Sequence, residues 1–362
     1  MGVKCGIVGL PNVGKSTLFN ALTRANIQAQ NYPFCTIEPN TGMVEVPDPR
    51  LHEIANIAKS AKMIPSTMEF VDIAGLVEGA SQGEGLGNQF LGHIRSVQAI
   101  MHVVRCFEDD NITHVSGKVN PLEDIATIET ELALADIQTL EKARSKYQKI
   151  CKTGDKKAAK TLACVEKIIT QLDKHQNLQD SIDDPECQEI CQTYQLLSAK
   201  PVLFVANVSD PQQPSPLLDQ VCKYASARNA SVIHLCAAIE AELADIEPEE
   251  QQEFLSELGL LEPGLHQVIR ACYDLLGLET FFTAGPKESR AWTIRKQARA
   301  PQAAGCIHTD FEKSFIRAEV IAYKDYITYK GEQGAKNQGV WRLEGKDYVV
   351  QDGDILVIRS GS

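Results

Sequence analysis

One run near the N-terminus constrains the fold more than any other feature of this chain: Gly9-Leu10-Pro11-Asn12-Val13-Gly14-Lys15-Ser16. The apolar residues 5–8 before it predict a strand, and residues 17–22 after it predict a helix. A strand, a glycine loop and a helix in this order bind phosphates, because backbone N–H groups and the helix N-terminus surround the phosphate chain. We therefore expect an α/β nucleotide-binding fold.

Further residues complete this predicted phosphate site. Lys15 is expected to reach the terminal phosphates, and the Ser16 hydroxyl is placed to ligate Mg²⁺. A predicted strand ends in Asp72-Ile73-Ala74-Gly75, where the carboxylate would hold a magnesium-bound water and the glycine N–H would meet the γ-phosphate. Between the two motifs, Thr36 would close on the metal and the γ-phosphate only when a triphosphate is bound. The alternative for Thr36 is an ordinary loop residue.

Hydrolysis needs a group that orients water. The position after Asp-x-x-Gly carries a glutamine in Ras-like proteins, but here it holds Leu76, which cannot position water. Ligands of such folds sit at the carboxyl ends of the strands, and the loop 108–118 follows the predicted strand 101–107. His114 lies in that loop and is our candidate for orienting water or handling a proton. The alternative is a surface-loop histidine.

The base-reading segment is ambiguous. Asn207-Val208-Ser209-Asp210 follows a predicted strand at the place where GTPases have Asn-Lys-x-Asp, whose aspartate accepts two hydrogen bonds from guanine. Val208 replaces the lysine that covers the base. Ala238 replaces a second lysine, that of the Ser-Ala-Lys motif. Guanine specificity is therefore open.

The chain of 362 residues is long enough for two or three domains. Apolar residues at helical spacing predict a long helix from Pro121 and a second one after a break at 153–155, which together form a helical hairpin. We expect a nucleotide-binding domain over 1–118 and 200–280, the inserted hairpin over 119–199, and a C-terminal domain over 281–362.

The C-terminal segment is predicted to consist mostly of short strands, at 281–284, 290–294 and on both sides of the turn around Gly353. Thr309-Asp310 is expected to cap a helix that carries Phe311, Phe315 and Ala318 on one face.

Charge is unevenly distributed along the chain. The net charge is -12, but residues 281–362 carry 7 Lys and 6 Arg against 10 acidic residues, a net +3 that leaves −15 for the remainder. Basic residues gather near the start of this segment and favour RNA or ribosome contact over a merely solvated surface: Lys287, Arg290, Arg295, Lys296 and Arg299.

Other compositional features indicate the compartment. No apolar run approaches the ~20 residues that span a bilayer, and the N-terminus reads as a strand and not as a signal peptide. The 11 cysteines lack CxxC spacing, which favours reduced thiols. We expect a cytoplasmic protein that does not bind membranes.

Residues 9–17, 34–40, 72–76 and 207–210 closely resemble the Obg-like ATPase (YchF) family of translation-factor-class P-loop proteins, and the resemblance extends over essentially the whole chain. It implies a G-protein fold with a C-terminal β-grasp (TGS) domain, slow hydrolysis of ATP in preference to GTP, a need for Mg²⁺, and association with the ribosome through its large subunit. It also implies RNA contacts from the helical hairpin and the TGS domain. Carried onto this sequence, it implies these roles: Asn12, Val13, Gly14, Lys15, Ser16 and Thr17 bind phosphates, Ser16 and Thr36 ligate Mg²⁺, Asn207 and Val208 meet the base, and His114 contributes to catalysis.

One departure from the family pattern bears on the nucleotide. The family usually has glutamate where this chain has Asp210, which is also the guanine-reading residue type. We still expect ATP, because neither lysine is restored and a carboxylate would meet a ring-nitrogen acceptor on adenine. The alternatives are a GTPase of the same fold, or a ribosome-binding module with the nucleotide as a structural ligand. Asn12 resembles an asparagine that binds K⁺ in related NTPases, and the alternative is an ordinary turn residue. Cys35 adjoins Thr36, where oxidation would disturb closure on the metal, but an unreactive loop cysteine is the favoured interpretation.

Overall fold

The computed structural model describes residues 3–24, 40–73, 86–115, 117–174, 178 and 184–361. The chain forms two compact units, residues 1–42 with 69–268 (unit 1) and residues 43–68 with 269–362 (unit 2). The sequence predicts that 43–68 and 269–280 belong to the nucleotide-binding domain, whereas their contacts group them with the C-terminal segment.

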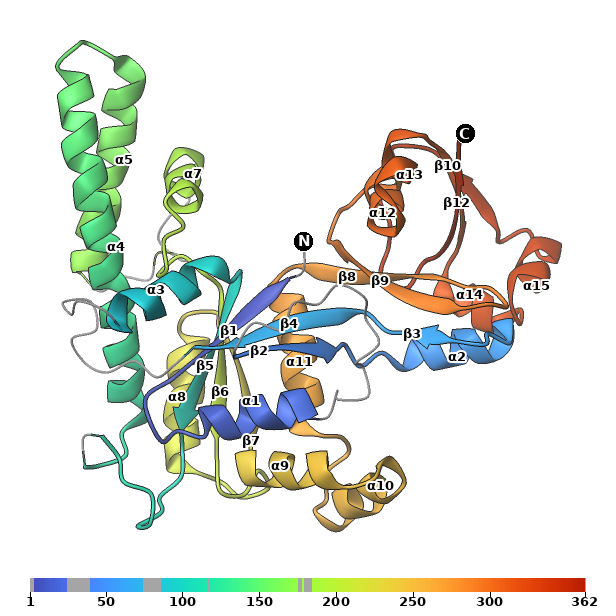
Figure 1. Cartoon of the computed structure of the whole chain (residues 1–362), viewed down its shortest axis with the longest axis horizontal. Helices are drawn as coiled ribbons and strands as arrows, with labels where there is room; N and C mark the ends of the chain where they lie inside the picture. The colour runs from blue at the N-terminus through green and yellow to red at the C-terminus, as the bar shows by residue number, and fades with distance from the viewer. Residues whose placement is uncertain are drawn as a thin grey trace. The chain divides into compact units, whose positions relative to one another are not determined.

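Unit 1 is built on a six-stranded sheet in the order β2-β4-β1-β5-β6-β7 (Figure 1). From β4 to β7 all neighbours are parallel. The backbone bonds of Asp72 to Asn40 and of Val46 to Ser66 run in opposite order along the two chains, so β2 and β4 are antiparallel. The strands are β1 (Lys4–Val8), β2 (Thr41–Glu45), β4 (Thr67–Asp72), β5 (Ala99–Arg105), β6 (Val202–Asn207) and β7 (Ser231–Leu235).

The parallel strands bring five carboxyl ends to one edge of this sheet. All seven residues of the central strand β5 are buried, as expected for a sheet covered on both faces, whereas the edge strand β7 is partly exposed. The helices of this unit are α1 (Lys15–Arg24), α3 (Leu86–Ser96), α4 (Pro121–Cys151), α5 (Lys156–Asp173), α7 (Pro185–Thr193), α8 (Pro216–Ser226), α9 (Ala237–Asp245) and α10 (Pro248–Glu257), with α11 (Gly264–Leu275) leading into unit 2.

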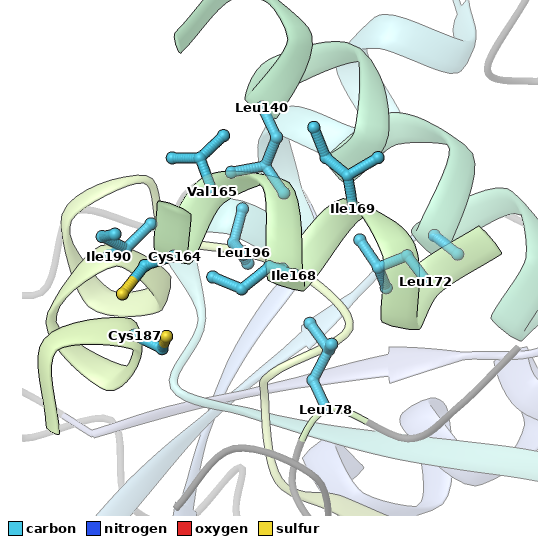
Figure 2. Close-up of a cluster of buried hydrophobic side chains, with 11 residues drawn as sticks. Leu140, Cys164, Val165, Ile168, Ile169, Leu172, Leu178, Cys187, Ile190 and Leu196 are labelled. Carbon is cyan, nitrogen blue, oxygen red and sulfur yellow. The ribbon is translucent and has the colours of Figure 1, made fainter. Parts of the chain in front are cut away.

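The predicted helical hairpin is present as α4 and α5, which we call the helical arm (Figure 1). Asn120 caps α4, Pro121 occupies its first turn, and Asp155 caps α5 directly after the predicted break. The apolar stripes of the two helices face each other and are closed by α7 (Figure 2). This core contains Leu140 of α4, Val165, Ile168, Ile169 and Leu172 of α5, and Cys187 and Ile190 of α7. Packing within the arm therefore explains the stripe of α5 and the part of the α4 stripe around Leu140, whereas Ile125 of α4 packs against the sheet residues Val104 and Phe204.

Unit 2 contains a second six-stranded sheet in the order β11-β10-β12-β8-β9-β3. The pairs β12–β8 and β3–β9 are parallel, and the pairs β8–β9, β10–β12 and β10–β11 are antiparallel. Its strands are β3 (Met63–Ile64), β8 (Leu278–Thr283), β9 (Ser289–Arg295), β10 (Phe315–Ile321), β11 (Arg342–Glu344) and β12 (Ile355–Ser360). Its helices are α2 (Pro49–Ala58), α12 (Ala300–Ile307), α13 (Thr309–Lys313), α14 (Tyr323–Thr328) and α15 (Glu332–Asn337).

One prediction in unit 2 is wrong. The helix expected after Thr309-Asp310 is only the five-residue α13, and its N-cap is His308, whose side chain accepts from the Asp310 N–H. Phe315 and Ala318 lie on strand β10, where both are buried in the apolar core. A pattern of only three apolar side chains is too short to distinguish a helix from a buried strand.

The described cysteines form no disulfide. Burial raises the pKa of the Cys106 thiol to about 12, so this side chain acts as a small apolar group. Over the described ranges, no helix combines the length and the apolar character needed to cross a bilayer.

Candidate functional site

The predicted phosphate loop connects β1 to α1 at the carboxyl edge of the sheet in unit 1. Gly9 and Gly14 are required there for steric reasons. A Cβ atom on Gly9 would lie 2.7 Å from the Val103 carbonyl oxygen, and one on Gly14 would lie 2.3 Å from Nδ2 of Asn207. Gly14 also has φ +95°, a conformation that costs other residues ~1–2 kcal/mol. The loop conformation therefore depends on glycine at both ends.

Lys15 begins α1 and points to the end of the neighbouring strand β4. Its Nζ lies 2.8 Å from Oδ1 of Asp72, and both side chains are largely buried. A buried ammonium requires an anionic partner, and Asp72 is that partner in this structure. Phosphate oxygens are chemically equivalent partners, so the pair marks where the terminal phosphates and a metal ion would compete for these two side chains. Ser16 and Thr17 are exposed at the same helix N-terminus.

Asn207, the last residue of β6, joins the phosphate loop to the start of α9. Its Nδ2 donates to the Val13 carbonyl at 3.0 Å, and its Oδ1 accepts from the Ala237 N–H at 2.9 Å. Asn207 is buried, and both bonds are buried too. The side chain thus fixes the position of the phosphate loop relative to the start of α9.

Val208 and Asp210 are the two residues of the base motif whose roles the sequence left open, and they lie in different environments. The Val208 side chain is buried among Val104, Cys106, Phe204 and other apolar residues, so it does not offer a side chain to a base. A contribution of Val208 to nucleotide binding would have to come from its backbone.

Asp210 closes a local turn. Its Oδ1 accepts from the Gln212 N–H at 2.8 Å, and its Oδ2 accepts from Nε2 of Gln213 at 2.8 Å. Both carboxylate oxygens are therefore engaged within residues 210–213, as in an Asx turn.

The loop that follows β5 reaches both the phosphate loop and the helical arm. Nδ2 of Asn12, a phosphate-loop residue, donates to the Thr113 carbonyl at 3.1 Å. The next residue, His114, is buried, and its Nε2 lies 3.0 Å from Oδ2 of Asp124 in the first turn of α4. Burial raises the pKa of Asp124, and the hydrogen bond with His114 opposes this rise.

Arg105 holds the backbone of the same loop, and the sequence patterns did not predict this role. Its guanidinium donates to the carbonyl oxygens of Phe107, Asp109 and Ile112 at 3.1, 3.2 and 3.0 Å, and it lies over the Phe107 ring. Arg105 is 1% exposed. The sequence does contain one indication of this role, an arginine at the end of an otherwise apolar strand, since a buried guanidinium must find hydrogen-bond acceptors within the protein.

Several predicted site residues lie outside the described residues: Cys35, Thr36, Gly75 and Leu76. Among the described ones, the structure brings together Asn12, Lys15, Asp72 and Asn207 at the carboxyl edge of one sheet. His114 adjoins this group through the preceding residue, Thr113, whose carbonyl accepts the hydrogen bond from Asn12.

The phosphate loop lies between a buried strand and a helix, and its lysine pairs with the aspartate at the end of the neighbouring strand. Together with the order of the parallel strands, these features define a P-loop nucleotide-binding protein of the G-protein class. A family model described as "50S ribosome-binding GTPase" (MMR_HSR1) matches residues 4–142, and a model named YchF-GTPase_C, described as a protein of unknown function, matches residues 278–360. The chain belongs to the YchF family.

Full-length relatives carry this assignment. The chain is 59% identical to the "Ribosome-binding ATPase YchF" of Haemophilus influenzae, with 99% of both chains covered, and 59% identical to that of Escherichia coli O157:H7, with 98% of both covered. It is 52% identical to the protein of the same name from Bacillus subtilis over 99% of both. The solved structure of the Schizosaccharomyces pombe YchF GTPase superimposes with a TM-score of 0.89 at 37% identity, covering 99% of this chain and 98% of that one. The family resemblance and the fold class predicted from the sequence are confirmed.

Proposed function

We propose that this protein is a nucleotide-dependent switch that hydrolyses ATP slowly and binds the ribosome. The observation that carries the proposal is the Lys15–Asp72 ion pair at the mouth of the phosphate loop, because it places a cation and a carboxylate where a triphosphate and its metal ion would bind. Relatives at 52–59% identity over the full chain are named ribosome-binding ATPases, which supports both the reaction and the partner.

Asp210 supports ATP over GTP. Reading guanine requires a carboxylate with two oxygens directed at the base, but both oxygens of Asp210 hold its own turn. The missing lysines at Val208 and Ala238 support the same preference. A GTPase of the same fold is the second candidate, since the solved Schizosaccharomyces pombe relative is called a GTPase. Asn207 and Val208 are proposed to border the base, Asn207 by fixing the phosphate loop and the start of α9 and Val208 through its backbone.

Mg²⁺ is the proposed metal cofactor, held by Ser16 and Thr36 with Asp72 nearby. Hydroxyl and carboxylate oxygens are the hard donors that Mg²⁺ prefers, and the exposed Ser16 at the start of α1 fits this requirement. When bound, Mg²⁺ neutralises charge that develops on the phosphates. Lys15 then pairs with the phosphates, and the N–H groups of residues 12–17 surround them.

K⁺ is a further proposed ion, with Asn12 as its ligand. Because Nδ2 of Asn12 donates to the Thr113 carbonyl, its amide oxygen is the atom that would contact the ion. Equal hydrolysis rates in sodium and potassium salts would exclude this role.

His114 is the proposed group that orients water or handles a proton. It follows Thr113, which contacts the phosphate loop, and the glutamine of Ras-like enzymes is replaced by Leu76. Without that glutamine, unassisted turnover is expected at roughly 10⁻⁴ to 10⁻² per second, the range of switch GTPases.

Ribosome binding is assigned to two parts of the chain, and its target is proposed to be the large subunit in the cytoplasm. The helical arm (within 119–199) and the C-terminal TGS domain (281–362) would contact ribosomal RNA, while the nucleotide domain (1–118 and 200–280) would control their engagement. Within the basic group of unit 2, Arg299 is paired with Asp347 at 2.7 Å. Lys296 lies 3.9 Å from Asp274. Lys287, Arg290 and Arg295 are therefore the first candidates of this group to face RNA. The other candidate is a ribosome-binding module that holds nucleotide without useful turnover.

Single-turnover hydrolysis tests the proposal. The full chain is mixed with limiting ATP and Mg²⁺ in potassium buffer, with and without ribosomes, and compared with the variant His114→Ala. We expect slow hydrolysis that the substitution reduces. Bound ATP that is never hydrolysed under either condition would favour the module with a structural nucleotide, and unchanged turnover in the variant would remove His114 from the reaction.

A further inference from the structure

The loop between β5 and α4 joins three parts of unit 1. Arg105 holds its backbone through three carbonyl groups, Thr113 accepts a hydrogen bond from the phosphate loop, and His114 contacts the helical arm. Thr113 and His114 are consecutive, so their Cα atoms lie about 3.8 Å apart. Any change in the first turn of α4 therefore acts on a residue directly beside the phosphate loop.

The contact with the arm has the geometry of a specific hydrogen bond. Nε2 of His114 and Oδ2 of Asp124 are 3.0 Å apart, and both side chains are about 95% buried. With Asp124 ionised, its carboxylate can only accept a hydrogen bond, and the tautomer of His114 that pairs with it carries the ring proton on Nε2. The ring is then held in one tautomer and one rotation, with Nδ1 as the acceptor nitrogen.

We propose that Asp124 is the positioning residue of His114, fixing the tautomer and orientation in which the histidine handles the attacking water. This rests on the proposed function of His114. The logic is that of carboxylate–histidine pairs in hydrolases, where the carboxylate orients the imidazole and does not touch the substrate. Because Asp124 belongs to α4, the helical arm supplies part of the hydrolytic machinery.

A purely structural role is the competing explanation. Acidic side chains in the first turn stabilise a helix by about 0.3–1 kcal/mol through its dipole, and Glu123 and Asp124 both occupy the first turn of α4. Glu123 therefore provides a matched control, since Glu123→Gln removes one charge from the same turn and leaves His114 untouched.

The test measures steady-state ATP hydrolysis by the full chain for Asp124→Asn, Glu123→Gln, His114→Ala and the double variant Asp124→Asn/His114→Ala. Asp124→Asn is expected to lower kcat by about tenfold to a hundredfold with KM unchanged. The double variant should be no slower than His114→Ala alone, since both changes remove the same function. Glu123→Gln should match the unchanged protein.

A spectroscopic measurement separates orientation from folding. In protein labelled with ¹⁵N-histidine, the ring shifts of His114 should show the proton on Nε2, and Asp124→Asn should move it to Nδ1 or mix the two tautomers. Thermal unfolding of the same variant checks that the fold is retained.

The outcomes distinguish the two levels of the proposal. If His114→Ala lowers kcat but Asp124→Asn leaves it unchanged or raises it, Asp124 does not position His114 and the inference is wrong. If neither substitution alters kcat, the proposed role of His114 fails as well. If Asp124→Asn and Glu123→Gln lower kcat equally, the effect belongs to the helix and not to the pair.

Discussion

Replacing Asn207 with alanine tests the hydrogen-bonded link between the phosphate loop and the start of α9. The change removes two buried hydrogen bonds and leaves the Val13 carbonyl and the Ala237 N–H without these partners. Each bond contributes ~0.5–1.5 kcal/mol, and each buried group left unsatisfied costs ~1–3 kcal/mol. Water that enters the vacated space recovers part of this, so we expect a loss of about 2–4 kcal/mol in the stability of unit 1.

The same substitution should weaken nucleotide binding, because bound phosphates must then order the loop. A loss of 2 kcal/mol corresponds to roughly a 30-fold weaker affinity. Titration with a fluorescent ATP analogue measures this effect. Urea unfolding followed by circular dichroism measures the stability of the chain, while fluorescence of the two tryptophans, Trp292 and Trp341, follows unit 2 alone.

The control is Asn337→Ala, an exposed asparagine on α15 that should change stability by less than about 0.5 kcal/mol. The reasoning would be refuted by an Asn207→Ala protein whose ATP affinity and unfolding free energy both match those of the control.

Three further predictions follow from the described contacts. Burial lowers the pKa of His102 from 6.5 to about 4. Between these values the folded state binds fewer protons than the unfolded state, so stability falls as the pH falls through this window. In His102→Leu, the loss of stability between pH 7 and pH 5, measured by urea unfolding, should be smaller by about 2 kcal/mol. Asp210→Ala should leave the ATP-to-GTP preference unchanged and cost about 1 kcal/mol from its turn, whereas a changed preference in a competition assay would mean that the carboxylate contacts the base. The double change Lys287→Gln/Arg290→Gln should weaken ribosome binding and flatten its salt dependence in sedimentation assays, and an unaltered salt slope would assign the contact elsewhere.

The nucleotide site could be predicted from the sequence because its chemistry is local. The residues from Gly9 to Ser16 are contiguous, and their glycine, lysine and hydroxyl positions follow from the demands of a phosphate chain. Asp72 could be paired with this loop because parallel strands end at the same edge of a sheet. The structure confirms their juxtaposition in the Lys15–Asp72 ion pair.

The remaining features depend on contacts that spacing does not encode. The partner of His114 is an aspartate on a helix that reads as an ordinary amphipathic segment, and the two functions of the Asn207 side chain require knowing where Val13 and Ala237 lie. Val208 could be recognised as a replaced lysine, but its burial in an apolar cluster is a result of tertiary packing. The helix predicted over Phe315 and Ala318 failed for the same reason, because sheet pairing overrides a short apolar pattern.

The central claim is that this site takes ATP in preference to GTP. The carboxylate of Asp210, at the position that reads guanine in GTPases, is engaged in its own turn, and Val208 and Ala238 replace the two lysines. A competition titration of the full chain, with a fluorescent nucleotide displaced by ATP or GTP in Mg²⁺ and K⁺, tests it directly. The account predicts that ATP displaces the probe at a lower concentration than GTP. Equal displacement, or displacement by GTP at the lower concentration, would contradict it.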